Sequence, residues 1–153
     1  MAPMVETTAF SGLRSWLLDL KNDGAEIVII GTTPSGVWNV PAELARRKFL
    51  GRDTADVESI DRARFDNYTY PVKSRLMTLA AGIGGKFVDP LAYLCDNHRC
   101  PTVDSEGMPY FRDESHYRSA AVKTSRFEFL DDATGLRRQV SAAPIAGNGA
   151  PNL

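Results

Sequence analysis

The sequence lacks long apolar runs and an excess of charge of either sign. No segment approaches the roughly 20 consecutive apolar residues that a membrane-spanning helix requires. Met1 to Thr8 shows neither the basic n-region nor the apolar h-region of a signal peptide, so none is predicted. The 18 basic and 19 acidic residues are interspersed without a basic stripe and give a net charge of -1. This balance argues against a nucleic-acid partner and against an anionic membrane surface.

The usual phosphate-binding and nucleophile motifs are also missing. The one Gly/Ser-rich turn after a strand is Gly31-Thr32-Thr33-Pro34-Ser35-Gly36. It does not fit the Gly-x-Ser-x-Gly nucleophile elbow. It also fails as a P-loop, because Val37-Trp38 stands where Lys-Ser/Thr is needed. Ser35 is therefore interpreted as a turn residue.

What the chain does have is enough apolar sequence for one compact core: 43% of its 153 residues are hydrophobic. The apolar run Ile27 to Ile30 predicts a strand buried on both faces, and Lys86 to Asp89 predicts a second, short strand. Apolar spacing and Gly/Pro signals predict helices over residues 11–22, 41–47, 72–83 and near 116–131, with a further charged helix within 53–67. The tail Ser141 to Leu153 is rich in Ala, Gly, Pro and Asn and is predicted to be disordered.

These elements alternate along the chain and predict an α/β architecture with parallel strands. Only two core strands are visible, so the sheet is expected to be incomplete. Trp16 and Trp38 are interpreted as packing residues. Because Trp38 follows a strand, it is alternatively a residue of a cleft at the carboxyl end of the sheet.

The most informative segment is Tyr110 to Ser119, which holds an Asp-x-x-His at Asp113 and His116. In a Ser/His/Asp site the imidazole takes a proton from a hydroxyl, while a carboxylate fixes its tautomer and stabilises the imidazolium. The alternative is structural: Asp113 caps a helix by accepting from the backbone at Ser115 or His116. On spacing alone, the capping role is the more common one.

The surroundings of this pair resemble a known family. Pro90 to Ser119 is similar to the last block of SGNH hydrolases, specifically the periplasmic SGNH domain fused to membrane acyltransferases of the acyltransferase-3 family. The matching pieces, in order, are Val88-Asp89-Pro90, the loop from Cys95 to Pro101, Gly107-Met108-Pro109 and the run from Tyr110 to His116. Upstream, Ile27 to Pro34 is similar to a strand and turn of the same family.

The resemblance implies an incomplete SGNH-hydrolase, flavodoxin-like three-layer fold with a short parallel sheet, carried by residues 8–131. It implies that Asp113 and His116 are catalytic, with no cofactor and no metal. SGNH enzymes take their nucleophile from a Gly-Asp-Ser block and oxyanion donors from a Gly-x-Asn-Asp block, and neither block occurs here. The expectation is therefore the C-terminal part of an SGNH domain, with the N-terminal half and a transmembrane acyltransferase domain encoded upstream.

The two cysteines, Cys95 and Cys100, flank a polar turn. In a periplasmic protein of this family they are expected to form a small disulfide loop. Two free thiols are the alternative for a cytosolic chain. Zinc bound by both cysteines with His98 and His116 is disfavoured, because Cys-x-x-His-x-Cys matches no usual structural zinc pattern.

The function implied by the resemblance is O-acyl transfer, usually of acetyl, to a sugar hydroxyl of a cell-surface polysaccharide or lipopolysaccharide. The parent protein would act on the periplasmic side of the bacterial inner membrane. Two alternatives stay open: an esterase that hydrolyses such acyl groups with the same residues, and a non-catalytic remnant. Arg112 and Arg118 flank the catalytic loop and are candidates for contacting an anionic sugar or orienting Asp113.

Overall fold

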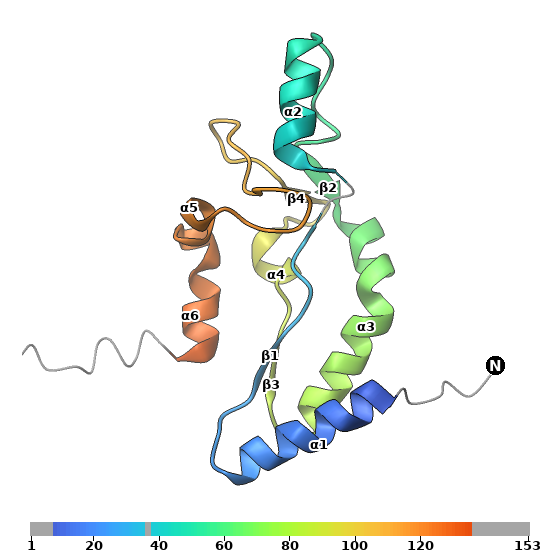
Figure 1. Cartoon of the computed structure of the whole chain (residues 1–153), viewed down its shortest axis with the longest axis vertical. Coiled ribbons are helices and arrows are strands. Elements are labelled where there is room, and N and C mark those ends of the chain that lie inside the picture. Colours follow the sequence, from blue (N-terminus) through green and yellow to red (C-terminus); the bar gives the residue numbers. More distant parts are fainter. Residues whose placement is uncertain (1–7, 36–37, 136–153) are drawn as a thin grey trace, which may run out of the picture.

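The computed structural model describes residues 8–35 and 38–135 (Figure 1). The tail predicted at 141–153 lies outside the described residues. In chain order the elements are α1 (Thr8–Asn22), β1 (Val28–Ile30), α2 (Val40–Phe49), β2 (Ser59–Asp61), α3 (Arg62–Gly82), β3 (Lys86–Val88), α4 (Leu91–Leu94), β4 (Arg99–Pro101), α5 (Ser119–Val122), the 3-10 helix η1 (Ser125–Phe127) and α6 (Glu128–Thr134).

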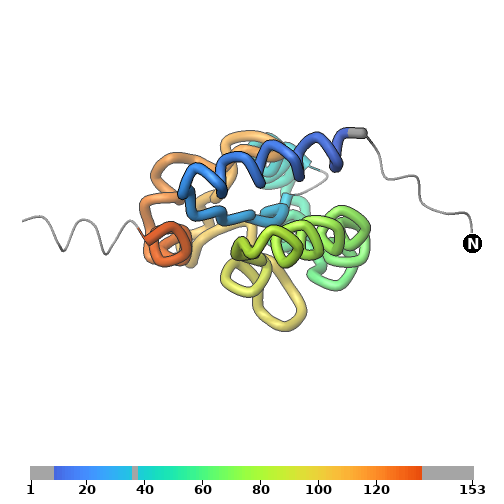
Figure 2. Tube along the Cα trace, turned by 90° about the horizontal axis from the view of Figure 1, so that it is seen from below, coloured from blue at the N-terminus to red at the C-terminus, as the bar shows by residue number. Residues whose placement is uncertain are grey.

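The two predicted strands form the predicted parallel pair, with Ile29 opposite Phe87 and Ile30 opposite Val88. Neighbouring positions of a strand point to opposite faces. Accordingly, Ile29 packs with the buried core of α1 and α3, whereas Val88 packs with that of α4, η1 and α6. In Figure 1 and in the view of Figure 2, α3 and α6 lie on opposite sides of the molecule. The result is the expected α/β layering around a short parallel sheet.

The expectation that the first strand is buried on both faces is wrong, because Val28 and Ile29 are only half-buried. Ile30 is 40% exposed. Ile30 lies on the same face of the sheet as Val88. The helices that cover this face, α4, η1 and α6, pack against Val88 of β3 and leave Ile30 exposed. Among the described residues β1 pairs only with β3, and a two-stranded sheet cannot bury every side chain of its strands.

The charged segment 53–67 is not one helix. Residues 59–61 form β2, which pairs antiparallel with β4, and α3 begins directly after it. Asp61 caps α3 by accepting from the backbone N–H of Arg64 at 2.7 Å. The pairing of β2 with β4 joins residues about 40 positions apart, and no local pattern predicts such a contact. The helix predicted over 72–83 lies within α3; of its apolar residues Leu79 is buried, whereas Val72 is 50% exposed.

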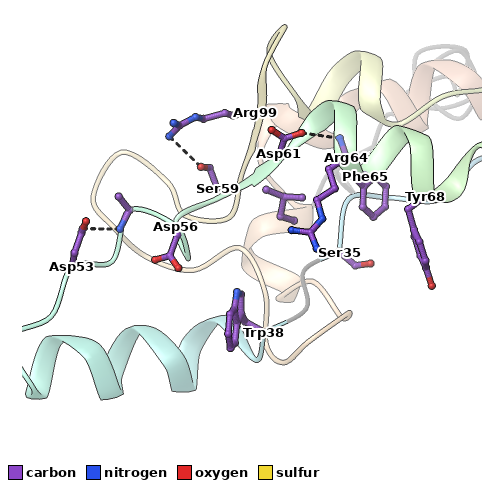
Figure 3. A pocket seen from close by; sticks show the side chains of 12 residues that line it. Ser35, Trp38, Asp53, Asp56, Ser59, Asp61, Arg64, Phe65, Tyr68 and Arg99 are labelled. Carbon is purple, nitrogen blue, oxygen red and sulfur yellow. Dashed lines mark hydrogen bonds between the residues drawn. The ribbon is translucent and has the colours of Figure 1, made fainter.

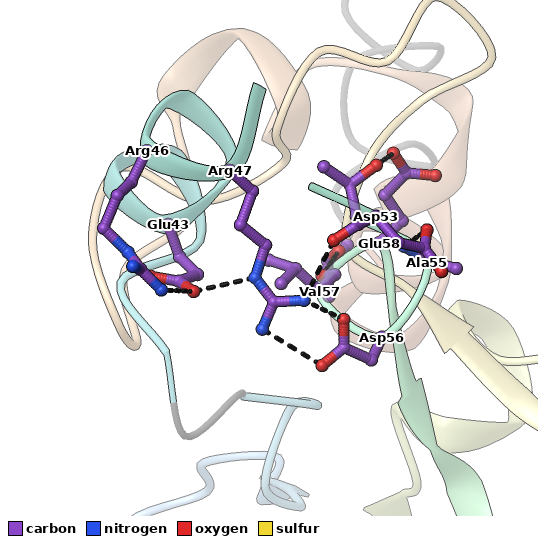
Figure 4. Close-up of polar contacts among 10 residues, drawn as sticks. Glu43, Arg46, Arg47, Asp53, Ala55, Asp56, Val57 and Glu58 are labelled. Atoms are coloured by element: carbon purple, nitrogen blue, oxygen red, sulfur yellow. Dashed lines mark hydrogen bonds and ion pairs between the residues drawn. The ribbon is translucent and has the colours of Figure 1, made fainter. Parts of the chain in front are cut away.

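Helix α2 begins as predicted, with Pro41 in its first turn and Asn39 accepting from the N–H of Ala42. Its basic end is not simply solvated. Arg47 donates to Glu43 within the helix and also pairs with Asp56 and the carbonyl of Asp53 in the following loop (Figure 4). This network fixes the 52–57 loop against the end of α2.

The predicted closing helix over 116–131 is broken into three pieces, namely α5, η1 and α6. The chain around His116 is a turn, and the first helical residue is Ser119. The physical reason is an antiparallel bridge between Phe111 and Tyr117, which holds the segment extended on both sides of the Asp-x-x-His.

Candidate active site

The hairpin that precedes the Asp-x-x-His segment fixes the position of that segment. Thr102 is buried and is held to the β2 side of the molecule by a bond from its Oγ1 to the carbonyl of Val57. The chain then turns at Asp104, whose carboxylate accepts from two backbone N–H groups, and at Gly107, whose φ of 76° favours glycine. It returns so that the N–H of Tyr110 donates to the carbonyl of Thr102 at 2.8 Å.

Two aromatic residues anchor the turn itself. Phe111 is 1% exposed and packs with Val40, Leu44 and Val57. The ring of Tyr117 lies against Phe111, at 4.4 Å between centroids, and its hydroxyl donates to the carbonyl of Pro34 at 2.8 Å. Pro34 follows β1, so this bond places the turn beyond the carboxyl end of the parallel strand. Burial raises the pKa of the Tyr117 phenol, which therefore stays a neutral donor.

The structure brings Asp113 and His116 together. Both carboxylate oxygens lie 3.0 Å from Nδ1 of His116, and Oδ1 also accepts from the backbone N–H groups of Ser115 and His116. The capping contacts and the imidazole contact are thus made by one carboxylate. No helix follows directly, so the cap stabilises a turn.

The electrostatics of the pair follow from these contacts. The backbone N–H groups of Ser115 and His116, and then the imidazole, lower the pKa of Asp113 to about 2. The carboxylate is therefore ionised at neutral pH and orients Nδ1 as a hydrogen donor. His116 is exposed over 76% of its side chain, and its Nε2 makes no hydrogen bond to any described residue. With Nδ1 against the carboxylate, Nε2 is the ring nitrogen that remains accessible.

Arg112 and Arg118, which flank the Asp-x-x-His, lie in different surroundings. Arg112 is exposed, with Nε 4.0 Å from Oδ2 of Asp113, at the outer limit of an ion pair. Arg118 instead lines a small pocket of about 280 Å³ together with Tyr110 and Arg126. Of the two candidates, Arg112 alone approaches the carboxylate.

Cys95 and Cys100 are bonded to each other, with Cα atoms 4.1 Å apart. Cys100 is fully buried in β4, so the bridge ties the 95–99 turn to the β2–β4 pair. Bonded sulfurs are not zinc ligands, and among the described residues no group of three or more His, Cys, Asp and Glu is placed to hold a metal ion.

An open cleft of about 920 Å³ lies between the turn after β1 and the start of α3 (Figure 3). Trp38 lines it and is 42% exposed, so of its two interpretations the cleft residue fits and the packing residue does not. Trp16 is 59% exposed on α1, so it is not a packing residue either.

The sequence reasoning missed the anchors of the site. Phe111 and Tyr117 stand on either side of the Asp-x-x-His, and this symmetric placement of aromatics was the available signal for a bridged turn. No local sequence pattern identifies Arg64 as a cleft residue. It lines the cleft because the pairing of β2 with β4 positions the start of α3 there.

Comparison with known proteins gives one match to a family and one to a solved structure. The family described as "SGNH domain (fused to AT3 domains)" matches residues 3–131. The solved structure is the lipopolysaccharide acetyltransferase periplasmic domain of Salmonella ser. Paratyphi A, with a TM-score of 0.60 and 14% sequence identity. No curated protein matches the chain.

The structural match covers 90% of this chain but 51% of the Salmonella domain, so the chain spans about half of that domain's length. At this identity the likeness concerns the fold alone. Among the described residues no helix is both long and apolar enough to cross a bilayer. Because the family match spans most of the 153 residues, the chain belongs to the SGNH domain family that occurs fused to AT3 domains.

Proposed function

We propose that this chain supplies the general base and its orienting carboxylate to an SGNH-type O-acyltransferase. The enzyme would move an acyl group, typically acetyl, to a hydroxyl of a cell-surface polysaccharide or lipopolysaccharide on the periplasmic side of the membrane. The observation that carries the proposal is the contact of Asp113 with Nδ1 of His116, which leaves Nε2 free on an exposed side chain.

In the proposed reaction His116 removes the proton from a serine hydroxyl as the serine oxygen attacks the acyl carbonyl. His116 then returns that proton to the leaving group, and the acyl-serine remains. In the second half, His116 takes the proton of the sugar hydroxyl as it attacks, and passes it to the serine oxygen. Asp113 stays ionised throughout and stabilises the imidazolium.

In this proposal the serine and the oxyanion donors come from residues outside this chain. Its sequence has no Gly-Asp-Ser and no Gly-x-Asn-Asp block. An SGNH half that carries these blocks and a transmembrane acyltransferase domain are therefore the proposed partners. Family membership supports this arrangement, because the family occurs fused to AT3 domains.

Two competing functions use the same residues. If water replaces the sugar as the acceptor, the same His116 and Asp113 give an acyl-ester hydrolase. The bonds from Asp113 to two backbone N–H groups favour a third possibility, a purely structural role for the Asp-x-x-His in a non-catalytic remnant.

The test is an acetyl-ester assay on three proteins. The 153-residue chain alone is expected to show no serine-dependent turnover above background. The same chain joined to a Gly-Asp-Ser-bearing N-terminal SGNH half of a family member should be active, and His116→Ala in the joined domain should abolish that activity. Adding a sugar acceptor separates transfer from hydrolysis.

Two results would contradict the proposal. One is an active joined domain that is indifferent to His116→Ala, which would assign the pair a structural role. The other is activity of the chain alone that is lost on treatment with a serine-directed fluorophosphonate, which would place a nucleophile among its own serines.

A further inference from the structure

The cleft of about 920 Å³ combines a flat aromatic wall with charged groups of both signs. Trp38 lies on one side, and Arg64 and Tyr68 reach it from the first turns of α3 (Figure 3). Tyr68 is 83% exposed and stands four residues after Arg64, so both are on one face of the helix.

The indole of Trp38 is held from one side. The guanidinium carbon of Arg47 lies 5.8 Å from the ring centroid, in the range of a cation–π contact. Arg47 is itself fixed by a 2.7 Å bond to Glu43 and by its pair with Asp56. The ring is thus supported by α2 and the 52–57 loop, while 42% of the residue stays exposed. A ligand that stacks on the ring therefore costs little further side-chain entropy.

Two guanidinium groups of the cleft are available for a ligand, those of Arg64 and Arg99. The backbone N–H of Arg64 donates to Asp61, but its guanidinium bonds no residue among those that the structure describes. Figure 3 shows this side chain extending from α3 towards Ser35. Arg99, which also lines the cleft, approaches the hydroxyl of Ser59 at 3.5 Å, a long and weak contact.

We propose that this cleft binds a neutral pyranose ring of the acceptor polysaccharide, a subsite that rests on the proposed function. The C–H face of a pyranose is apolar and flat and packs on an indole, while its equatorial hydroxyls match the forked donors of a guanidinium. Charges of both signs line the cleft, namely Arg64 and Arg99 against Asp53, Asp56 and Asp61. An anionic sugar would meet the three carboxylates, so a neutral ring is favoured.

The cleft is connected to the Asp-x-x-His turn. Tyr117, the residue after His116, bonds the carbonyl of Pro34, and the next residue, Ser35, lines the cleft. A sugar in the cleft therefore sits beside the segment on which the imidazole turn is docked.

The experiment measures sugar binding directly and needs no catalysis. Trp16→Phe leaves Trp38 as the single tryptophan, because the chain contains two. The indole N–H signal of Trp38 is then followed by NMR during titration with the methyl glycosides of glucose, galactose, mannose and rhamnose. At least one neutral glycoside is expected to shift this signal saturably.

Variants then locate the site. Arg64→Gln and, by ligand-observed NMR, Trp38→Ala should each weaken binding about tenfold or more, whereas Trp38→Phe should retain most of it. Arg14→Gln, an exposed arginine on α1, is the matched control and should bind like the parent. Circular dichroism confirms that each variant is folded.

The proposal is overturned if none of the glycosides shifts the Trp38 signal, or if folded Trp38→Ala and Arg64→Gln bind as the parent does. His116→Ala separates this subsite from the proposed function, since it should leave glycoside binding intact. Loss of catalysis in the joined domain with binding retained supports both. If a glycoside binds but His116→Ala does not change turnover of the joined domain, the sugar subsite is supported and the proposed acyl transfer is refuted.

Discussion

The carboxylate of Asp113 meets His116 twice, once at the backbone N–H at 2.9 Å and once at Nδ1 of the ring at 3.0 Å. The first contact shapes the turn and the second orients the imidazole. Because one group makes both, the orientation of the imidazole is coupled to the shape of the turn. A substitution that tests the orienting role of Asp113 must therefore remove the negative charge and keep the hydrogen bonds that shape the turn.

Asp113→Asn makes that distinction. The amide oxygen can still accept from the backbone N–H groups of Ser115 and His116, so the protein should remain folded. The negative charge that stabilises the imidazolium is lost, so acyl transfer by the domain joined to its nucleophile half should fall on the order of a hundredfold or more. Glu114→Gln, an exposed neighbour, is the control and should leave the rate unchanged. Equal activity of Asp113→Asn and the parent would refute the orienting role.

Stability should fall in acid because of the same carboxylate. The pKa of Asp113 is lowered from 3.8 to about 2 by the backbone N–H groups of Ser115 and His116 and then by the imidazole. A lowered folded-state pKa stabilises the fold above the unfolded value, and this contribution is lost as the pH falls from about 3.8 towards 2. Glu43, whose pKa is lowered to about 2 by Arg46 and Arg47, acts in the same direction.

Urea unfolding between pH 5 and pH 2 measures this effect. The free energy of unfolding of the parent should decrease over this range, and that of Asp113→Asn should decrease less. Parallel curves for the two proteins would show that Asp113 does not contribute.

Tyr117→Phe tests the docking of the turn on the end of β1. The substitution removes the hydroxyl that donates to the carbonyl of Pro34 but keeps the ring between Phe111 and Phe127. The free energy of unfolding should fall by about 1 kcal/mol, the net value of a typical hydrogen bond. Amide hydrogen exchange should become faster in the turn that carries His116, whereas α3 should exchange as before. Unchanged exchange in the turn would mean that the ring alone holds it.

Reduction of the Cys95–Cys100 bond should destabilise the protein only moderately. The two residues are five positions apart, and such a small loop restricts the unfolded chain by about 2 kcal/mol. Unfolding curves with and without reductant measure the difference, with Cys95→Ala/Cys100→Ala as an independent check. The oxidised protein should react with no thiol reagent, and two titratable thiols before reduction would contradict the bond.

The amino-acid sequence predicts the α/β character and the parallel pair, and its family resemblance selects Asp113 and His116 as the candidate residues. These depend on local patterns: a β-branched apolar run for β1, a proline in the first turn of α2 and a three-residue spacing that lets one carboxylate reach both a backbone and a ring nitrogen. The interactions that form each strand, the start of α2 and the contact of Asp113 with His116 act between residues near in sequence, so a local pattern predicts them. The pairing of β1 with β3 joins residues about 60 positions apart and follows instead from the alternation of strands and helices along the chain.

The remaining features depend on contacts between distant segments. The pairing of β2 with β4 turned a charged predicted helix into a strand, and the bridge of Phe111 with Tyr117 replaced a predicted helix at His116 by a turn. Both depend on hydrogen bonds or packing whose partners are chosen by the whole fold. The cleft of Trp38 and Arg64 is likewise assembled from segments that the chain separates, because side chains from β1's turn and α3 become neighbours only when the sheet and its flanking helices have packed.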